Sequence, residues 1–378
     1  MTSSGIRLAS AVIALLIAAP IAAQTVKLTS PNATLAEDFS AIRGVRELAD
    51  GRVLVSDYID QRVVLVDLAR GTVILRVTKG GGPLEARLPT RLIPVPGDST
   101  ILTDLGNNRL QLLDGQGRVV RTIAAEHQGV MGLHGVDAGG ALYYAVPGWA
   151  EGPAELPNDS VRIVKWNPRT GAVDDIAVIQ GERMRSDIRE PARTPRIPTI
   201  GYAAGDGWTV SDRGVVRIVR AGGYRVESRA PGSAPILGPS YAYATRPVTA
   251  EEKLAYVRRF AESTPTSGKG ENGGMGFSPT LSQADIVAMA RGTQFAERHP
   301  MFNPGDVVAA PGGRLWVGRG AEDGKPVLYD VFDDGGRRVS TVELLPGRRV
   351  VSIGRQSVYV VAELESGIQH LERHPLPR

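Results

Sequence analysis

The sequence predicts an all-β fold built from repeated antiparallel units, on three observations. The 45 glycines and 26 prolines punctuate the chain at short intervals, which favours many short strands over a few long helices. Apolar runs joined by tight turns recur along the chain. An Asp followed five positions later by an Arg also recurs, with strand-like runs on both sides. Such repetition indicates one supersecondary unit used several times.

Six strand–turn–strand units follow one another, and each contains a turn signal rich in Gly, Asp or Pro. Their sequences are RELADGRVLVSD, IPVPGDSTILTD, GVDAGGALYYAV, YAAGDGWTV, VVAAPGGRLWVG and VVSIGRQSVYVV. One such sheet cannot cover both of its faces, whereas sheets packed around an axis bury them and a closed ring shields their edges. The sequence therefore predicts a single six-bladed β-propeller over residues 24–378. The run TVKLTS at 25–30 is expected to complete the last blade.

The N-terminus has the composition of a signal peptide. Arg7 precedes an uncharged apolar run that ends in small residues, with a plausible cleavage point after Ala23. A membrane anchor is the alternative, but Pro20 interrupts the run, which is short for a span of about 20 apolar residues. Residues 1–23 are therefore predicted to direct export to the periplasm or the extracellular space. No later segment is long and apolar enough to predict an integral membrane span.

Charge and cysteine content narrow the possible partners. The formal net charge is +4 and no run of lysines or arginines stands out, so a nucleic-acid partner is not expected. The chain has no cysteine, which excludes disulfides and cysteine-ligated metals. A monomer held together by its apolar core is expected.

The recurring Asp and Arg residues have a structural interpretation, because a single ligand site would not need three copies of the same pair. Each Asp is expected to accept hydrogen bonds from turn amides, and each Arg to reach back to it. The pairs are Asp57 with Arg62, Asp104 with Arg109, and Asp212 with Arg217.

The run VTKGGGPLEARLPTRL resembles the linker between blades in NHL-repeat proteins and related exported bacterial six-bladed propellers. In that family a Gly-rich turn, an acidic residue and a proline precede the next inner strand, and here these are 80–82, Glu85 and Pro89. The element at Asp104, with Asn107 and Asn108 before Arg109, is similar to the family's turn between second and third strands. The resemblance implies the fold more than a function, because many members have no assigned activity.

Function is expected where the repeat breaks. One break is the loop around Trp149 in blade three. The largest is a helical insertion at 246–300 between blades four and five. Two helices are predicted there, one with a capping box of Thr249 and Glu252. The insertion is either a helical pair packed on the propeller or a lid or docking arm over the axial opening.

The sequence favours a binding module over an enzyme. It has no His-Glu-x-x-His pattern and no Gly-x-Ser-x-Gly elbow. The predicted role is to bind a protein, peptide or saccharide ligand without a cofactor. Candidate contact residues, chosen by position near the axis or the rim, are Arg43, Arg91, His134, Trp149, Met275 and Phe277.

The alternative is a calcium-dependent hydrolase of the lactonase or arylesterase type, which the resemblance to six-bladed propellers also allows. Such enzymes hold a metal on the axis with acidic and amide side chains from several blades. The candidates here would be Asp57, Asp104, Asn303 and Asp306. An axis lined by several acidic or amide groups would favour the enzyme, and one lined by apolar or arginine side chains would favour the binder.

Overall fold

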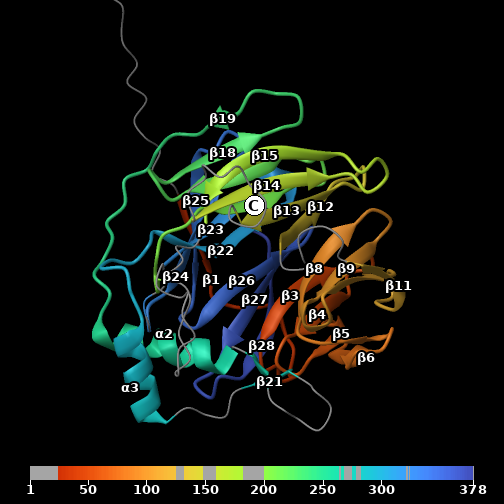
Figure 1. The fold of residues 1–378 in the computed structure, drawn as a ribbon, viewed down its shortest axis with the longest axis horizontal. Coiled ribbons are helices and arrows are strands. Elements are labelled where there is room, and N and C mark those ends of the chain that lie inside the picture. The colour runs from red at the N-terminus through yellow and green to blue at the C-terminus, as the bar shows by residue number, and fades with distance from the viewer. Residues whose placement is uncertain are drawn as a thin grey trace, which may run out of the picture.

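The computed structural model shows a six-bladed β-propeller, which confirms the predicted fold class (Figure 1). The structure describes residues 24–124, 132–147, 159–181, 200–263, 265–267, 275–277, 282–320, 322 and 324–377. The predicted signal peptide at 1–23 lies outside the described residues. No helix in these described ranges is long and apolar enough to span a bilayer.

The first three blades are antiparallel sheets whose strands follow one another outwards from the axis. Blade one contains β3 (Ile42–Glu47), β4 (Val53–Asp57), β5 (Arg62–Asp67) and β6 (Thr72–Lys79), with β7 (Glu85–Ala86) parallel to β6. Blade two contains β8 (Pro89–Val95), β9 (Ser99–Asp104), β10 (Arg109–Leu113) and β11 (Val119–Ala124). Blade three contains β12 (Leu133–Val136), β13 (Leu142–Pro147), β14 (Ser160–Trp166) and β15 (Val173–Gln180).

The last three blades repeat this order. Blade four contains β16 (Gly207–Val210), β17 (Val216–Arg220), β18 (Arg225–Arg229) and β19 (Ile236–Leu237). Blade five contains β22 (Phe302–Ala309), β23 (Leu315–Arg319), β24 (Val327–Phe332) and β25 (Arg338–Leu344). Blade six contains β26 (Arg348–Ile353), β27 (Ser357–Glu363) and β28 (Gln369–Pro375).

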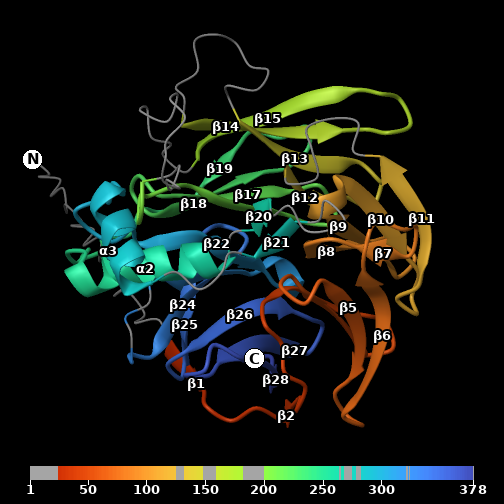
Figure 2. The ribbon, with the colours of Figure 1, turned by 60° about the horizontal axis from the view of Figure 1, so that its bottom comes forward.

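The first strand of each blade lies next to the axis. Contacts join these inner strands in the order β3, β8, β12, β16, β22 and β26, and β26 contacts β3 again. The ring is therefore closed, and Figure 2 shows the blades arranged around it.

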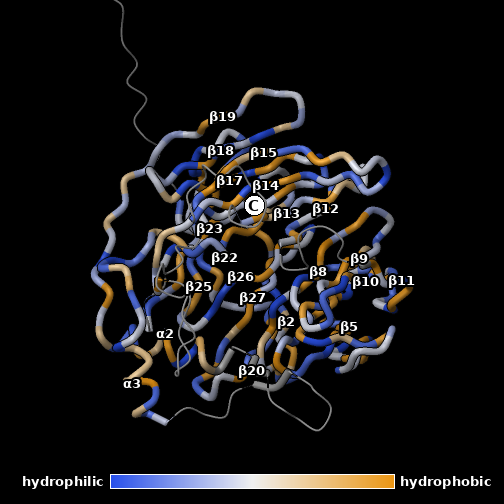
Figure 3. Tube along the Cα trace, in the orientation of Figure 1, coloured by the Kyte–Doolittle hydropathy of each residue, from blue (hydrophilic) through white to orange (hydrophobic). Residues whose placement is uncertain are grey.

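The apolar core is divided among the interfaces between blades. Each pair of neighbouring blades shares one buried cluster. Leu54 of blade one and Leu102 of blade two, for example, have no exposed surface and belong to the same cluster. In Figure 3, hydrophobic and hydrophilic residues alternate along several strands around the ring. Each sheet thus buries both faces against its neighbours, as expected for a repeat that is not stable alone.

The N-terminal segment completes two blades. Strand β1 (Gln24–Leu28) pairs in parallel with β25 of blade five, so the prediction that 25–30 completes the last blade was wrong. Leu28 is buried in the cluster between blades five and six, which fixes β1 at that edge. Blade six is instead completed by β2 (Ala33–Thr34), which pairs with β28. The flanking Leu35 N–H donates to the carbonyl of Leu371 at 2.9 Å.

The fourth predicted hairpin was displaced by one strand. Residues 201–206 lead into β16, and β16 itself is the inner strand of blade four. The true first turn of this blade follows Val210, where the Ser211 hydroxyl accepts a hydrogen bond from Val215 N–H at 3.2 Å. The error arose because turns between first and second strands carry the same Asp and Gly signals as turns between second and third strands.

The insertion between blades four and five contains the two predicted helices, α2 (Ala250–Ser263) and α3 (Gln283–Gly292). The capping box forms as predicted. Thr249 N–H donates to Glu252 Oε2 at 2.9 Å, and Glu252 N–H donates to Thr249 Oγ1 at 3.3 Å. The helices pack together through the buried Val257 and Ile286.

The insertion also packs on the segment that leads into blade four. The Tyr202 hydroxyl donates to the carbonyl of Glu252 at 3.0 Å, and its ring lies 5.1 Å from that of Tyr256. A short hairpin of β20 (Pro265–Ser267) and β21 (Met275–Phe277) extends from the helices. Figure 2 shows this hairpin in front of the central opening.

Candidate functional site

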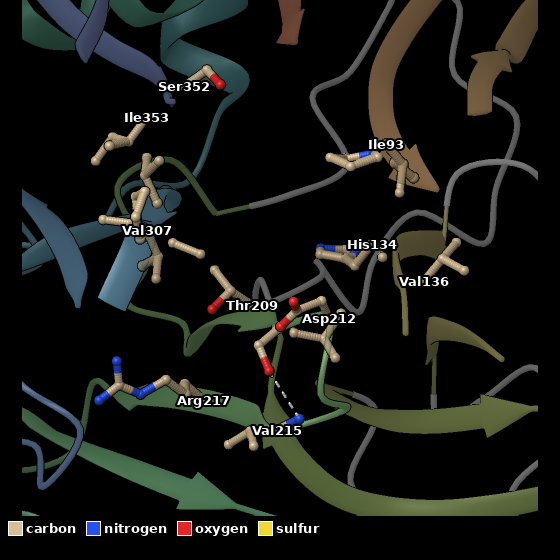
Figure 4. A pocket seen from close by; sticks show the side chains of 18 of the residues that line it. Ile93, His134, Val136, Thr209, Asp212, Val215, Arg217, Val307, Ser352 and Ile353 are labelled. Carbon is tan, nitrogen blue, oxygen red and sulfur yellow. Dashed lines mark hydrogen bonds between the residues drawn. The ribbon is translucent and has the colours of Figure 1, made fainter. Parts of the chain in front are cut away.

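A large cavity follows the propeller axis. Its volume is about 1740 Å³, and residues from all six inner strands line it. Figure 4 shows side chains from β8, β12, β16, β22 and β26 around this space, with His134 and Thr209 among them. Because each blade contributes one strand, side chains that are far apart in the sequence meet here.

One group of lining residues comes from the first half or the middle of the inner strands and is rich in positive charge. It contains three guanidinium groups, an imidazole, an indole and one carboxylate. We call this group the basic ring: Arg43, Arg91, His134, Trp208, Asp306 and Arg349.

Arg43 and Arg349 come from the neighbouring strands β3 and β26. Arg349 Nη2 donates to the carbonyl of Ile42 at 2.6 Å. The Arg43 guanidinium lies 5.4 Å from the centre of the Tyr58 ring. Burial lowers the pKa of Arg349, the positive charge of Arg43 lowers it further, and Asp306 opposes the shift. The positive charges of the two guanidinium groups therefore repel each other.

Asp306 is the only carboxylate of the basic ring. Its Oδ2 accepts a hydrogen bond from Asn303 Nδ2 at 2.9 Å. Burial raises the pKa of Asp306, and the hydrogen bond from Asn303 and then the charge of Arg349 oppose this shift only in part. The basic ring thus contains one carboxylate and three cations.

Arg91 and His134 form the second half of the ring. Arg91 Nη1 donates to the carbonyl of Leu133 at 3.3 Å, and burial lowers the pKa of Arg91 to about 10. Burial, helped by the charge of Arg91, lowers the pKa of His134 to about 3. His134 is therefore neutral near pH 7. Its ring stacks on Trp208 with centroids 4.2 Å apart and planes 22° apart.

The geometry fixes the proton of the neutral His134. Its Nδ1 lies 3.0 Å from the carbonyl oxygen of Gly132, which can only accept a hydrogen bond. Nδ1 therefore carries the proton, and Nε2 is a hydrogen-bond acceptor.

Charges near the other ends of the inner strands are paired. Arg46 Nη2 lies 3.1 Å from Asp98 Oδ1, and Arg355 Nε lies 3.4 Å from Glu47 Oε1. The cavity therefore has a basic section and a section whose charges are balanced.

The structure brings together three of the six candidate contact residues. Arg43, Arg91 and His134 line the same cavity. Trp149 lies outside the described residues. Met275 and Phe277 form the ends of β21, and their side chains lie outside the described part.

Sequence reasoning missed Trp208 and Arg349. Both occupy the second position of an inner strand, as Arg43 and His134 do. The correct register of blade four would have revealed Trp208, because it places Gly207 at the start of β16.

The second predicted turn pair forms a compact network. Asp104 is fully buried and accepts from Arg87 N–H and Arg109 Nε, each at 2.7 Å. Arg109 also donates to the carbonyls of Gly82 at 2.6 Å and Glu85 at 2.7 Å. The pair thus ties the turn to the Gly-rich linker between blades.

The other two pairs differ from this arrangement. Asp57 accepts from the amides of Ser40 and Ala41, but Arg62 lies 3.9 Å from it and binds Glu37 more closely, at 2.6 Å.

Arg217 does not reach back to Asp212. It donates to the carbonyls of Gly313 and Asp333 in the next blade instead. The displaced register explains this, because Arg217 pairs across the sheet with Thr209 and not with a turn residue.

The candidates for a calcium site do not form a donor set. Asp57 and Asp104 end second strands, and their carboxylates accept hydrogen bonds from backbone amides just before β3 and β8. The prediction placed these donors in the turns that follow the two Asp residues, and for these bonds it was wrong. Asn303 and Asp306 bond each other beside the positive Arg349. Within the described ranges, no three His, Cys, Asp or Glu residues gather as metal ligands. The residues described here therefore do not fit a calcium centre on the axis.

Comparison with known proteins adds a set of similar structures. No family model matches the chain, and no curated protein matches it in sequence. A gluconolactonase from Xanthomonas campestris is similar at 12% identity and a TM-score of 0.43, over 91% of this chain and 92% of the other. The calcium-binding protein regucalcin from Agrobacterium tumefaciens is similar at 13% identity and a TM-score of 0.42, over 94% of this chain and 100% of the other. A virginiamycin B lyase from Staphylococcus aureus is similar at 10% identity and a TM-score of 0.40, over 89% of this chain and 81% of the other.

Proposed function

We propose that this protein is an exported binding propeller whose axial cavity takes up a peptide, a segment of a protein or a saccharide. The cavity itself carries this proposal. It is about 1740 Å³ in volume, and polar and charged side chains from the inner strands line it. A concave site with a few converging polar groups is the usual form of a ligand site. Export is proposed from the composition of residues 1–23.

Binding is favoured over catalysis by the groups at this site. The imidazole of His134 is a weak base, because burial and Arg91 hold its pKa far below neutrality. A general base works best when its pKa lies near the working pH. The side chains of the basic ring are instead suited to hold a ligand by charge and hydrogen bonds.

A variant that fills the cavity tests the proposal. Thr209 lines the cavity, so Thr209→Trp should occupy part of it and block a ligand. Thr72→Trp places the same change at an exposed position of the outer strand β6 and is the matched control. Both variants and the wild type would be applied to arrays of peptides and of glycans.

The expected result is at least one ligand that the wild type and Thr72→Trp retain and that Thr209→Trp loses. Thermal unfolding of each variant shows whether it is folded. The proposal fails if the wild type retains nothing on either array, or if folded Thr209→Trp retains every ligand.

A further inference from the structure

The basic ring carries an imbalance of charge. Its six residues include three arginines and one carboxylate, and all six line the axial cavity. Among the residues that the structure describes, Arg43 and Arg91 have no carboxylate within ion-pair distance, whereas Arg46 and Arg355 at the other end do. The excess positive charge is thus confined to one section of the cavity.

This imbalance of charge is energetically costly. Burial without a counter-charge disfavours the ionised form of a side chain, and the lowered pKa of Arg91 has this cause. Arg43 and Arg349 also repel each other. Even if Asp306 balances one of the three arginines, the remaining positive charge favours an anion in the cavity.

We propose that the basic ring binds the acidic group of a ligand that also carries hydroxyl groups, an acidic saccharide. This inference rests on the proposed function and names the class of its ligand. Guanidinium groups match the oxygen geometry of a carboxylate or of a phosphate ester, and either group is compatible with the ring.

The hydroxyl groups of the ligand follow from His134. Its Nδ1–H is used by the carbonyl of Gly132, so Nε2 can only accept a hydrogen bond. A sugar hydroxyl can donate to it. A ligand with one acidic group and several hydroxyl groups satisfies both halves of the ring, and an acidic saccharide carries both kinds of group.

Titration with three related sugars tests this inference. D-glucuronate carries a carboxylate, D-glucose 6-phosphate a phosphate, and D-glucose neither. Calorimetry at constant ionic strength would measure the dissociation constant of each sugar from the wild-type protein. At least one acidic sugar should bind about tenfold more tightly than glucose, since charge-assisted hydrogen bonds are stronger than neutral ones. The tighter of the two acidic sugars identifies the acidic group that the ring prefers.

Arginine variants assign this preference to the ring. Arg91→Gln and Arg43→Gln should each reduce the preference for the acidic sugar over glucose about tenfold. Added salt should weaken the binding of the acidic sugars only. Arg169→Gln is the matched control, because Arg169 is exposed in the turn between β14 and β15.

The outcomes separate this inference from the proposed function. If neither acidic sugar binds more tightly than glucose, or if the preference persists in both arginine variants, the inference is overturned. The proposed function still stands in that case if Thr209→Trp loses an array ligand that Thr72→Trp retains. If Thr209→Trp also loses nothing, both fail.

Discussion

His134→Asn should make the folded protein less sensitive to acid. The asparagine amide can still donate to the carbonyl of Gly132, but it cannot take up a proton. The pKa of His134 is about 3 in the folded protein against 6.5 for a free side chain. Between these values the unfolded chain binds one more proton than the folded protein. The contribution of His134 to stability is therefore present above pH 6.5 and is lost as the pH falls.

The magnitude follows from the two pKa values. One pKa unit corresponds to about 1.4 kcal/mol, so lowering the pH from about 6 to about 4.5 should cost the wild type about 2 kcal/mol more than the variant. Urea unfolding followed by tryptophan fluorescence measures both proteins at each pH, and the chain has four tryptophans. Above about pH 7.5 the difference between the two proteins should be constant, which serves as the internal control. A difference that is the same at pH 6 and pH 4.5 would refute the argument.

Three further substitutions test the framework of the propeller by urea unfolding, the second with hydrogen exchange as well. Arg109→Ala leaves the buried Asp104 without its guanidinium partner and should lower the free energy of unfolding by about 3 kcal/mol. Arg118→Ala is the control, because Arg118 is 69% exposed in its pair and its loss should cost less than about 1 kcal/mol. Equal losses in the two variants would contradict the buried network. Thr249→Ala removes a cap of α2 and should cost about 1 kcal/mol, with faster amide exchange in that helix; unchanged exchange would argue against the cap. Leu35→Ala opens a void between blades six and one and should cost about 2–4 kcal/mol, and a loss below 1 kcal/mol would show that this contact is dispensable.

The repeated hairpins made the fold predictable from the sequence. Five of the six hairpins lie where first and second strands meet, because alternating apolar runs and tight turns are local signals. The fourth was displaced since local signals do not say which turn of a blade they belong to. The helical insertion was predictable for the same local reason, through the capping box at Thr249.

Part of the candidate site could also be predicted. Arg43, Arg91 and His134 lie near the starts of inner strands, and a closed ring brings such positions together. Arg349 lies at the corresponding position but shows no local signal of its own. The position of β1 could not be predicted, because blades five and six both offer an open edge, and β1 is placed by its five-residue pairing with β25 together with the burial of Leu28.

The edge pairing of β2 has a consequence for the way the protein is made. Ala33 pairs with Arg373, so this contact cannot form until residue 373 has been synthesised. Strand β2 is synthesised long before β28, so no early folding intermediate can contain the closed ring. A chain that stops before β28 would leave the final blade without the strand on which β2 is held. Premature termination should therefore expose the whole molecule to degradation, not just shorten it.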